Sequence, residues 1–176
     1  HNVVPPDQLQ ALRTTSEVLL ERQKLIWARQ RQEDDPPGGH WETSNQPRLL
    51  VQHQTDLIDA QTRDFVEFWL HENTLGTSAE LLQMPHAGVT EMMMMCNPVS
   101  DRGPARWHRD IHPIDTAPLQ GYLDDIAENG PRYVQWNIPL YDDDVLWGIP
   151  GSHLRPNSGT ENRQILEDPL QPVSGG

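Results

Sequence analysis

The hexapeptide Trp107-His108-Arg109-Asp110-Ile111-His112 lies in and just after a segment, Ala105–Ile111, that is typical of a β-strand. Residues two apart in a strand project to the same face, so His108 and Asp110 can present an imidazole nitrogen and a carboxylate oxygen to one ion. This pair supplies two of the three protein ligands of a 2-His-1-carboxylate site, which leaves coordination positions open at non-haem Fe(II). The spacing makes them candidate metal ligands; an exposed, hydrogen-bonded His-Asp pair is the alternative.

His112 is also two residues from Asp110, but it is a poor third ligand for the same ion. An extended strand separates positions 108 and 112 by about 13 Å, because each residue rises ~3.3 Å. Ligand atoms lie ~2 Å from a metal ion, so one straight strand cannot supply all three donors. We expect His112 to lie beside the metal ligands or in the substrate pocket, unless Pro113 bends the strand.

Three further segments have the composition of short strands. They are Val89–Cys96, Tyr133–Leu140 and Val145–Ile149, with turn signals at Asn129-Gly130-Pro131 and Pro150-Gly151. Earlier in the chain, apolar residues recur at helical spacing over Asp7–Arg31 and over Asp59–Leu82, with a break expected at Gly76. Helices followed by short strands predict an α+β chain, mainly helical over residues 1–84 and a β-sandwich or barrel over residues 85–176.

Four consecutive methionines, Met92–Met95, lie within the first of these strands. Thioether sulfurs bind copper, but neighbouring residues of a strand face opposite sides, so at most two of the four could reach one ion. Methionine is also an ordinary filler of irregular cores. We interpret the run as core packing, with Met92 and Met94 alternatively lining an apolar cavity.

Together, the segments WHRDIHP (107–113), VQWNIPLYDDD (134–144) and IPGSHLRPNS (149–158) resemble the phytanoyl-CoA dioxygenase family of Fe(II)- and 2-oxoglutarate-dependent oxygenases. In that family an HxD motif is followed by a strand, a short acidic or Asn-Gly loop and a PGSH-type turn. The resemblance covers roughly the second half of the chain, from Met84 to Asn157. It implies one domain with a double-stranded β-helix, a cupin-like jelly roll, flanked by the N-terminal helices.

The resemblance also implies site residues and an activity. His108 and Asp110 would hold Fe(II), and Trp136 would lie against the cosubstrate 2-oxoglutarate. Arg109 and His112 would lie in the substrate pocket or beside the ligands, and His153 would order the turn at the barrel mouth. Such an enzyme uses O2 and the decarboxylation of 2-oxoglutarate to hydroxylate a C–H bond of a small organic or acyl substrate.

Two residues of the family's site have no counterpart here. Family members add a distal histidine as the third iron ligand, and an arginine that pairs bidentately with the far carboxylate of 2-oxoglutarate, both several strands beyond the PGSH-type turn. Gly159–Gly176 contains no histidine, and Arg163 is its only arginine. We therefore expect a C-terminally truncated fragment with an incomplete barrel, which has little activity although its parent enzyme is active.

Composition narrows the possible partners. The 176 residues carry 13 Lys and Arg against 26 Asp and Glu, a net charge of -13, so binding to nucleic acid or to an anionic membrane through a basic patch is a poor hypothesis. No apolar run reaches the ~20 residues of a membrane span. Cys96 is the only cysteine, which excludes an intramolecular disulfide. We expect a cytoplasmic protein that acts on a small molecule, and we leave its oligomeric state open.

Two other classes of function stay open as hypotheses. A non-catalytic jelly-roll binding protein could retain the HxD motif as a relic, and the sequence beyond Gly176 discriminates it, because an active enzyme needs a histidine and an arginine there. A hydrolase-like site could instead bind zinc through His108, Asp110, His112 and a remote carboxylate. Metal analysis after anaerobic purification separates that case.

Overall fold

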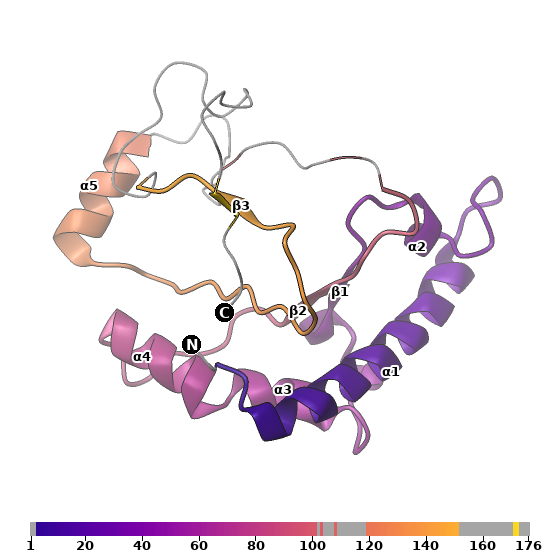
Figure 1. Ribbon diagram of the computed structural model, residues 1–176, viewed down its shortest axis with the longest axis horizontal. Coiled ribbons are helices and arrows are strands. Elements are labelled where there is room, and N and C mark those ends of the chain that lie inside the picture. The colour runs from indigo at the N-terminus through magenta and orange to yellow at the C-terminus, as the bar shows by residue number, and fades with distance from the viewer. Residues whose placement is uncertain (1–2, 102, 104–107, 109–118, 152–170, 173–176) are drawn as a thin grey trace. The chain divides into compact units, whose positions relative to one another are not determined.

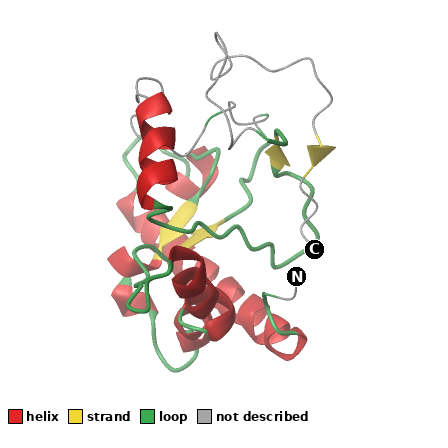
Figure 2. Ribbon diagram, turned by 90° about the vertical axis from the view of Figure 1, so that its left-hand side faces the viewer, coloured by secondary structure: helices red, strands yellow, loops and turns green. Residues whose placement is uncertain are grey.

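The structure is a computed structural model of the chain, and it describes residues 3–101, 103, 108, 119–151 and 171–172 (Figure 1). The chain divides into two compact units, residues 1–102 and residues 103–176. In the described part most regular structure is helical and the strands are short (Figure 2). None of the helices in these ranges is long and apolar enough to cross a membrane.

The first unit begins with a long helix, α1 (Pro6–Gln30), which confirms the helix predicted over Asp7–Arg31. Pro6 opens the helix, where its missing N–H removes a donor that would have no intrahelical partner. The buried face combines apolar and polar side chains: Leu12, Thr15, Ser16, Leu19, Gln23 and Trp27. Because half of this stripe is polar, packing rather than the hydrophobic pattern decides which face of α1 turns inward.

After α1 the chain turns back through a loop that closes on the end of the helix. Gly39 is buried and has a φ of +56°, a left-handed conformation that glycine adopts without strain. A Cβ at this position would collide with the carbonyl oxygen of Trp27. In the next short helix, α2 (His40–Thr43), Trp41 stacks on Trp27 with ring centroids 6.1 Å apart. The loop therefore packs closely against the last turns of α1.

Two short strands form the sheet of this unit. β1 (Arg48–Leu50) pairs antiparallel with β2 (Met93–Met95). Backbone hydrogen bonds continue the pairing beyond both ends, from the Val51 N–H to the Met92 carbonyl and from the Cys96 N–H to the Pro47 carbonyl. The strand predicted over Val89–Cys96 is therefore present in its second half.

The core of this unit gathers around Leu19 of α1. Its buried members are Leu19, Leu49, Val51, Leu57 and Phe65, and the half-buried side chains packed against them are Ile26, Ile58, Val66, Trp69, Met92 and Met94. Met92 and Met94 are therefore core residues, which confirms the interpretation of the methionine run as packing. Met95, by contrast, is 55% exposed.

The helical region predicted over Asp59–Leu82 contains three consecutive helices. They follow two 3-10 turns, η1 (Val51–His53) and η2 (Thr55–Leu57), and are α3 (Arg63–Trp69), the π-helix η3 (Glu72–Gly76) and α4 (Thr77–Leu82). Phe65 and Phe68 are buried, whereas Leu70, the residue that follows α3, is exposed. Gly76 ends η3, so the expected break falls where the helix type changes.

The second unit contains a helix that the sequence analysis missed, α5 (Leu119–Asn129). It ends at Gly130, whose φ of +77° fits the turn predicted at Asn129-Gly130-Pro131. Arg132 donates two hydrogen bonds to Asp125 of α5, Nε to Oδ2 at 3.0 Å and Nη2 to Oδ1 at 2.9 Å.

The strands of this unit are β3 (Trp147–Gly148) and β4 (Gln171–Pro172), which pair antiparallel. β3 lies within the strand predicted over Val145–Ile149. The strand predicted over Ala105–Ile111 lies outside the described residues, apart from His108. In the described part of the chain the strands form two two-stranded sheets, and the jelly roll stays a prediction.

Candidate metal centre

Of the predicted metal ligands, His108 lies among the described residues. It is exposed and belongs to neither a helix nor a strand. Asp110, Arg109 and His112 lie outside the described residues. The placement of the His108 imidazole and the Asp110 carboxylate on one strand face therefore stays a prediction, as do the pocket positions of Arg109 and His112.

Trp136, expected to lie against the cosubstrate, belongs to the segment Tyr133–Leu140. The strand predicted there is not formed, since these residues belong to neither a helix nor a strand, but their burial follows the pattern of a strand. From Tyr133 to Leu140 exposed and half-buried residues alternate, and the half-buried ones are Val134, Trp136, Ile138 and Leu140. A period of two is the signature of an extended chain with one sheltered side. Trp136 thus shares an apolar side with its neighbours at positions 134 and 138, and such a side suits the wall of a ligand cavity.

The turn predicted from the PGSH-type motif begins directly after β3. Gly151 has a φ of +75°, and no atom of the described residues is found within 4 Å of the place where its Cβ would be. Glycine at this position therefore serves the backbone conformation of the turn rather than close packing. His153 lies outside the described residues.

The donor chemistry of His108 and Asp110 decides which ion the pair suits. An imidazole and a carboxylate are two of the donors in a 2-His-1-carboxylate Fe(II) site. Within the described ranges no group of three or more His, Cys, Asp or Glu side chains is arranged to hold a metal ion. By donor type, the pair fits part of an Fe(II) site.

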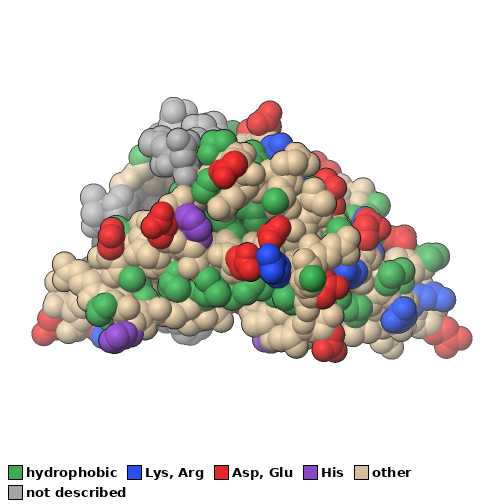
Figure 3. All heavy atoms as spheres, turned by 90° about the horizontal axis from the view of Figure 1, so that it is seen from below, with side chains coloured by type: hydrophobic (Ala, Val, Ile, Leu, Met, Phe, Trp, Pro, Cys, Tyr) green, Lys and Arg blue, Asp and Glu red, His purple; other side chains and the backbone are tan. Residues whose placement is uncertain are grey.

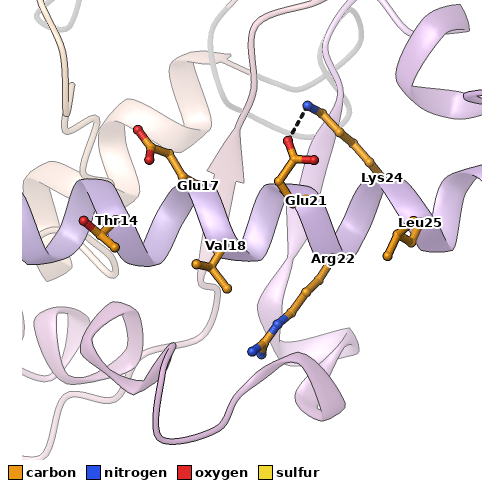
Figure 4. Close-up of a pocket in the computed structure, with 7 residues that line it drawn as sticks. All are labelled: Thr14, Glu17, Val18, Glu21, Arg22, Lys24 and Leu25. Carbon is orange, nitrogen blue, oxygen red and sulfur yellow. Dashed lines mark hydrogen bonds and ion pairs between the residues drawn. The ribbon is translucent and has the colours of Figure 1, made fainter.

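A groove runs along α1 on the surface of the first unit (Figure 4). Its lining residues are Thr14, Glu17, Val18, Glu21, Arg22, Lys24 and Leu25. Lys24 Nζ lies 2.7 Å from Glu21 Oε1, while the Arg22 side chain points to the other side of the helix (Figure 4). A groove formed by one helix lacks the enclosing apolar walls of a small-molecule site. It contains none of the predicted site residues.

A second hollow lies at the C-terminal end of α1, and sequence reasoning did not single it out. It is lined by Trp27, Gln30, Arg31, Asp35, His40 and Thr43. The Trp27 and His40 rings lie 5.4 Å apart, and Arg31 donates to the carbonyl of Asp35 at 3.1 Å. These contacts hold the loop after α1 in place, so we assign them a structural role.

Charged side chains of both signs lie near one another on the face shown in Figure 3 rather than gathering by type. Two carboxyl groups have a lowered pKa because an arginine hydrogen-bonds to them: Arg22 lowers the pKa of Asp59, and Arg132 lowers that of Asp125. Neither carboxylate is a predicted site residue. Both shifts therefore reflect ion pairs at the surface, which also perturb pKa values outside functional sites.

No family model, no curated protein and no solved structure matches the chain. The resemblance to the phytanoyl-CoA dioxygenase family rests on the three motif segments alone, residues 107–113, 134–144 and 149–158. The class of protein and its activity are therefore put forward as a proposal.

Proposed function

We propose that the chain belongs to a non-haem Fe(II)- and 2-oxoglutarate-dependent dioxygenase that hydroxylates a C–H bond of a small organic or acyl substrate. The order of three motifs carries the proposal: the His108–Asp110 pair, the segment around Trp136 and the turn at Gly151. The alternating burial over residues 133–140 and the positive φ of Gly151 support the second and third motifs. The net charge of -13 and the single cysteine favour a cytoplasmic enzyme with a small-molecule substrate.

The residues of this chain would position the reactants. His108 and Asp110 would hold the ion through one imidazole nitrogen and one carboxylate oxygen. When bound, Fe(II) with 2-oxoglutarate and O2 supplies the oxidising power for C–H hydroxylation. The apolar side that carries Trp136 would exclude water and orient the cosubstrate, while Arg109 and His112 would contact the substrate.

The test is turnover of 2-oxoglutarate by the protein that carries this sequence, expressed at the full length of its gene. With Fe(II), ascorbate and O2 we expect succinate to form, measured by mass spectrometry. His108→Ala and Asp110→Ala should each reduce succinate formation by more than about 100-fold, because loss of even a residue that supports a metal ligand typically costs 10–100-fold.

Two matched controls separate ligand loss from general damage. His86→Ala and Asp56→Ala remove the same kinds of side chain from exposed positions and should leave succinate formation unchanged. Equal succinate formation by the ligand variants and the wild type would overturn the proposal. Absence of succinate with folded wild-type protein would favour the non-catalytic binding protein instead.

A further inference from the structure

A histidine side chain holds the corner between α3 and α4 by accepting a hydrogen bond. His71 directly precedes η3, and its Nδ1 accepts the N–H of Asn73 at 3.0 Å. This amide belongs to the first turn of the helix, where N–H groups lack an intrahelical partner. An imidazole nitrogen accepts a hydrogen bond only while it carries no proton. The cap therefore requires Nδ1 of His71 to be unprotonated.

Asn73 in turn joins this corner to the segment that precedes α1. Its side-chain Nδ2 donates to the carbonyl of Val3 at 3.0 Å. The next residue, Thr74, is buried, and its Oγ1 lies 2.7 Å from the Phe68 carbonyl oxygen, so the turn is also anchored to α3. The His71 cap and the Thr74 hydrogen bonds therefore both hold Asn73 where its side chain reaches Val3.

We propose that His71 is a proton-sensitive clasp whose protonation releases the Asn73 amide and loosens the contact between Asn73 and Val3. Both nitrogens of a protonated imidazole are donors, so Nδ1–H would then face another N–H. Histidine is the side chain whose charge ordinarily changes between pH 5 and 8. Protonation of the His71 ring would therefore open the clasp.

Charged residues of both signs lie on η3 and on the two helices that contact it. The charged residues on the elements that contact η3 are Arg63, Asp64 and Glu67 on α3 and Glu80 on α4, and η3 itself carries Glu72. Arg63 pairs with Glu67 at 3.5 Å. These elements thus carry four carboxylates and one arginine.

The clasp is tested by an NMR titration of the 176-residue chain between pH 7.5 and pH 5. We expect the backbone amide of Asn73 to change its chemical shift together with protonation of the His71 ring. Relative to its intrinsic rate, its hydrogen exchange should become about fivefold faster, which corresponds to loss of a cap of about 1 kcal/mol. The side-chain NH2 signals of Asn73 should shift over the same pH range, because the hydrogen bond from Nδ2 to the Val3 carbonyl is lost.

Three variants make the result decisive. His71→Asn keeps a capping oxygen that does not titrate, so the Asn73 amide should stay protected and lose its pH dependence. His71→Ala should remove the protection at every pH, and His86→Ala, in an exposed loop, should behave like the wild type. The proposal fails if the Asn73 amide stays protected while His71 protonates, or if His71→Asn retains the pH-dependent step. Both comparisons hold even where His71→Ala does not fold.

Discussion

The guanidinium of Arg22 on α1 lies 3.0 Å from the carboxylate of Asp59, in the loop that leads into α3 (Nη2 to Oδ2). The same guanidinium donates to the Leu57 carbonyl at 2.8 Å and to the Gln61 side chain at 2.9 Å. The Arg22 hydrogen bond, followed by one from the Gln61 amide, holds the pKa of Asp59 below its ordinary value of 3.8. One cation therefore ties the middle of α1 to this loop.

Replacement of Asp59 should destabilise the protein in a pH-dependent way. Because its pKa is lowered in the folded chain, the ionised carboxyl contributes stability above about pH 4 and loses that contribution as the pH falls further. Asp59→Asn should therefore have a lower urea midpoint than the wild type at pH 7, and the difference should shrink as the pH falls below 3.8. Asp56→Asn, in the preceding 3-10 turn η2 and exposed, is the control. A difference that persists at low pH contradicts the ion-pair explanation.

Truncation of two leucines of α1 should change the free energy of unfolding by very different amounts. Leu19 is 0% exposed in the core, whereas Leu25 on the same helix is 59% exposed. Leu19→Ala should lower the free energy of unfolding by about 2–5 kcal/mol, because it removes buried contacts and leaves a cavity. Leu25→Ala should change it by less than about 0.5 kcal/mol. Urea denaturation measures both; similar losses would contradict the assignment of the buried face.

Cys96 should react slowly while the protein is folded. Burial raises the pKa of its thiol from 9.0 to about 11, and the positive charge of Lys24 only partly offsets this effect. The thiolate is the reactive form, so alkylation at pH 8 should be about 100-fold slower than in urea, where the thiol regains its ordinary pKa. The native rate should rise about tenfold per pH unit up to pH 10. Equal rates in the folded and unfolded chain would show that the thiol is accessible.

The helices of the first unit show what the sequence could predict. Spacing located α1 to within about one residue at each end, because apolar positions, a proline start and a loop of Pro and Gly agree. It did not show that Thr15, Ser16 and Gln23 are buried, because tertiary contacts decide which polar side chains turn inward. Similarly, the amino-acid pattern of residues 59–82 predicts a helix but does not distinguish a π-helix from an α-helix at Glu72–Gly76.

The second unit was harder to predict, and α5 shows why. The helix is short and contains Gly121 and several acidic residues, so its apolar signal is limited to Tyr122, Leu123 and Ile126. Gly130 was interpreted only as part of a turn, but a glycine at this position is also typical of the residue that follows a helix. The predicted strand over residues 133–140 shows the right alternation of burial, but a ladder depends on partner strands that local sequence does not specify.

Local spacing in the sequence could predict only part of the candidate metal site. Two-residue spacing selects His108 and Asp110 and argues against His112 as a third donor. In the proposed site the third ligand would come from a strand distant in sequence, which local patterns cannot locate. The core packing predicted for the methionine run is confirmed for Met92 and Met94.

The two-ligand prediction has a measurable consequence for the 176-residue chain alone. A His-Asp pair without a third protein ligand should bind Fe(II) weakly. Anaerobic titration with Fe(II), followed by equilibrium dialysis, measures the affinity. His108→Ala and Asp110→Ala should each abolish the weak binding, whereas Asp56→Ala should preserve it. Tight 1:1 binding that either ligand variant abolishes would show that this chain supplies a third ligand itself. Tight binding that survives both variants would place the metal elsewhere, because an ion held by neither His108 nor Asp110 cannot occupy the site their spacing defines.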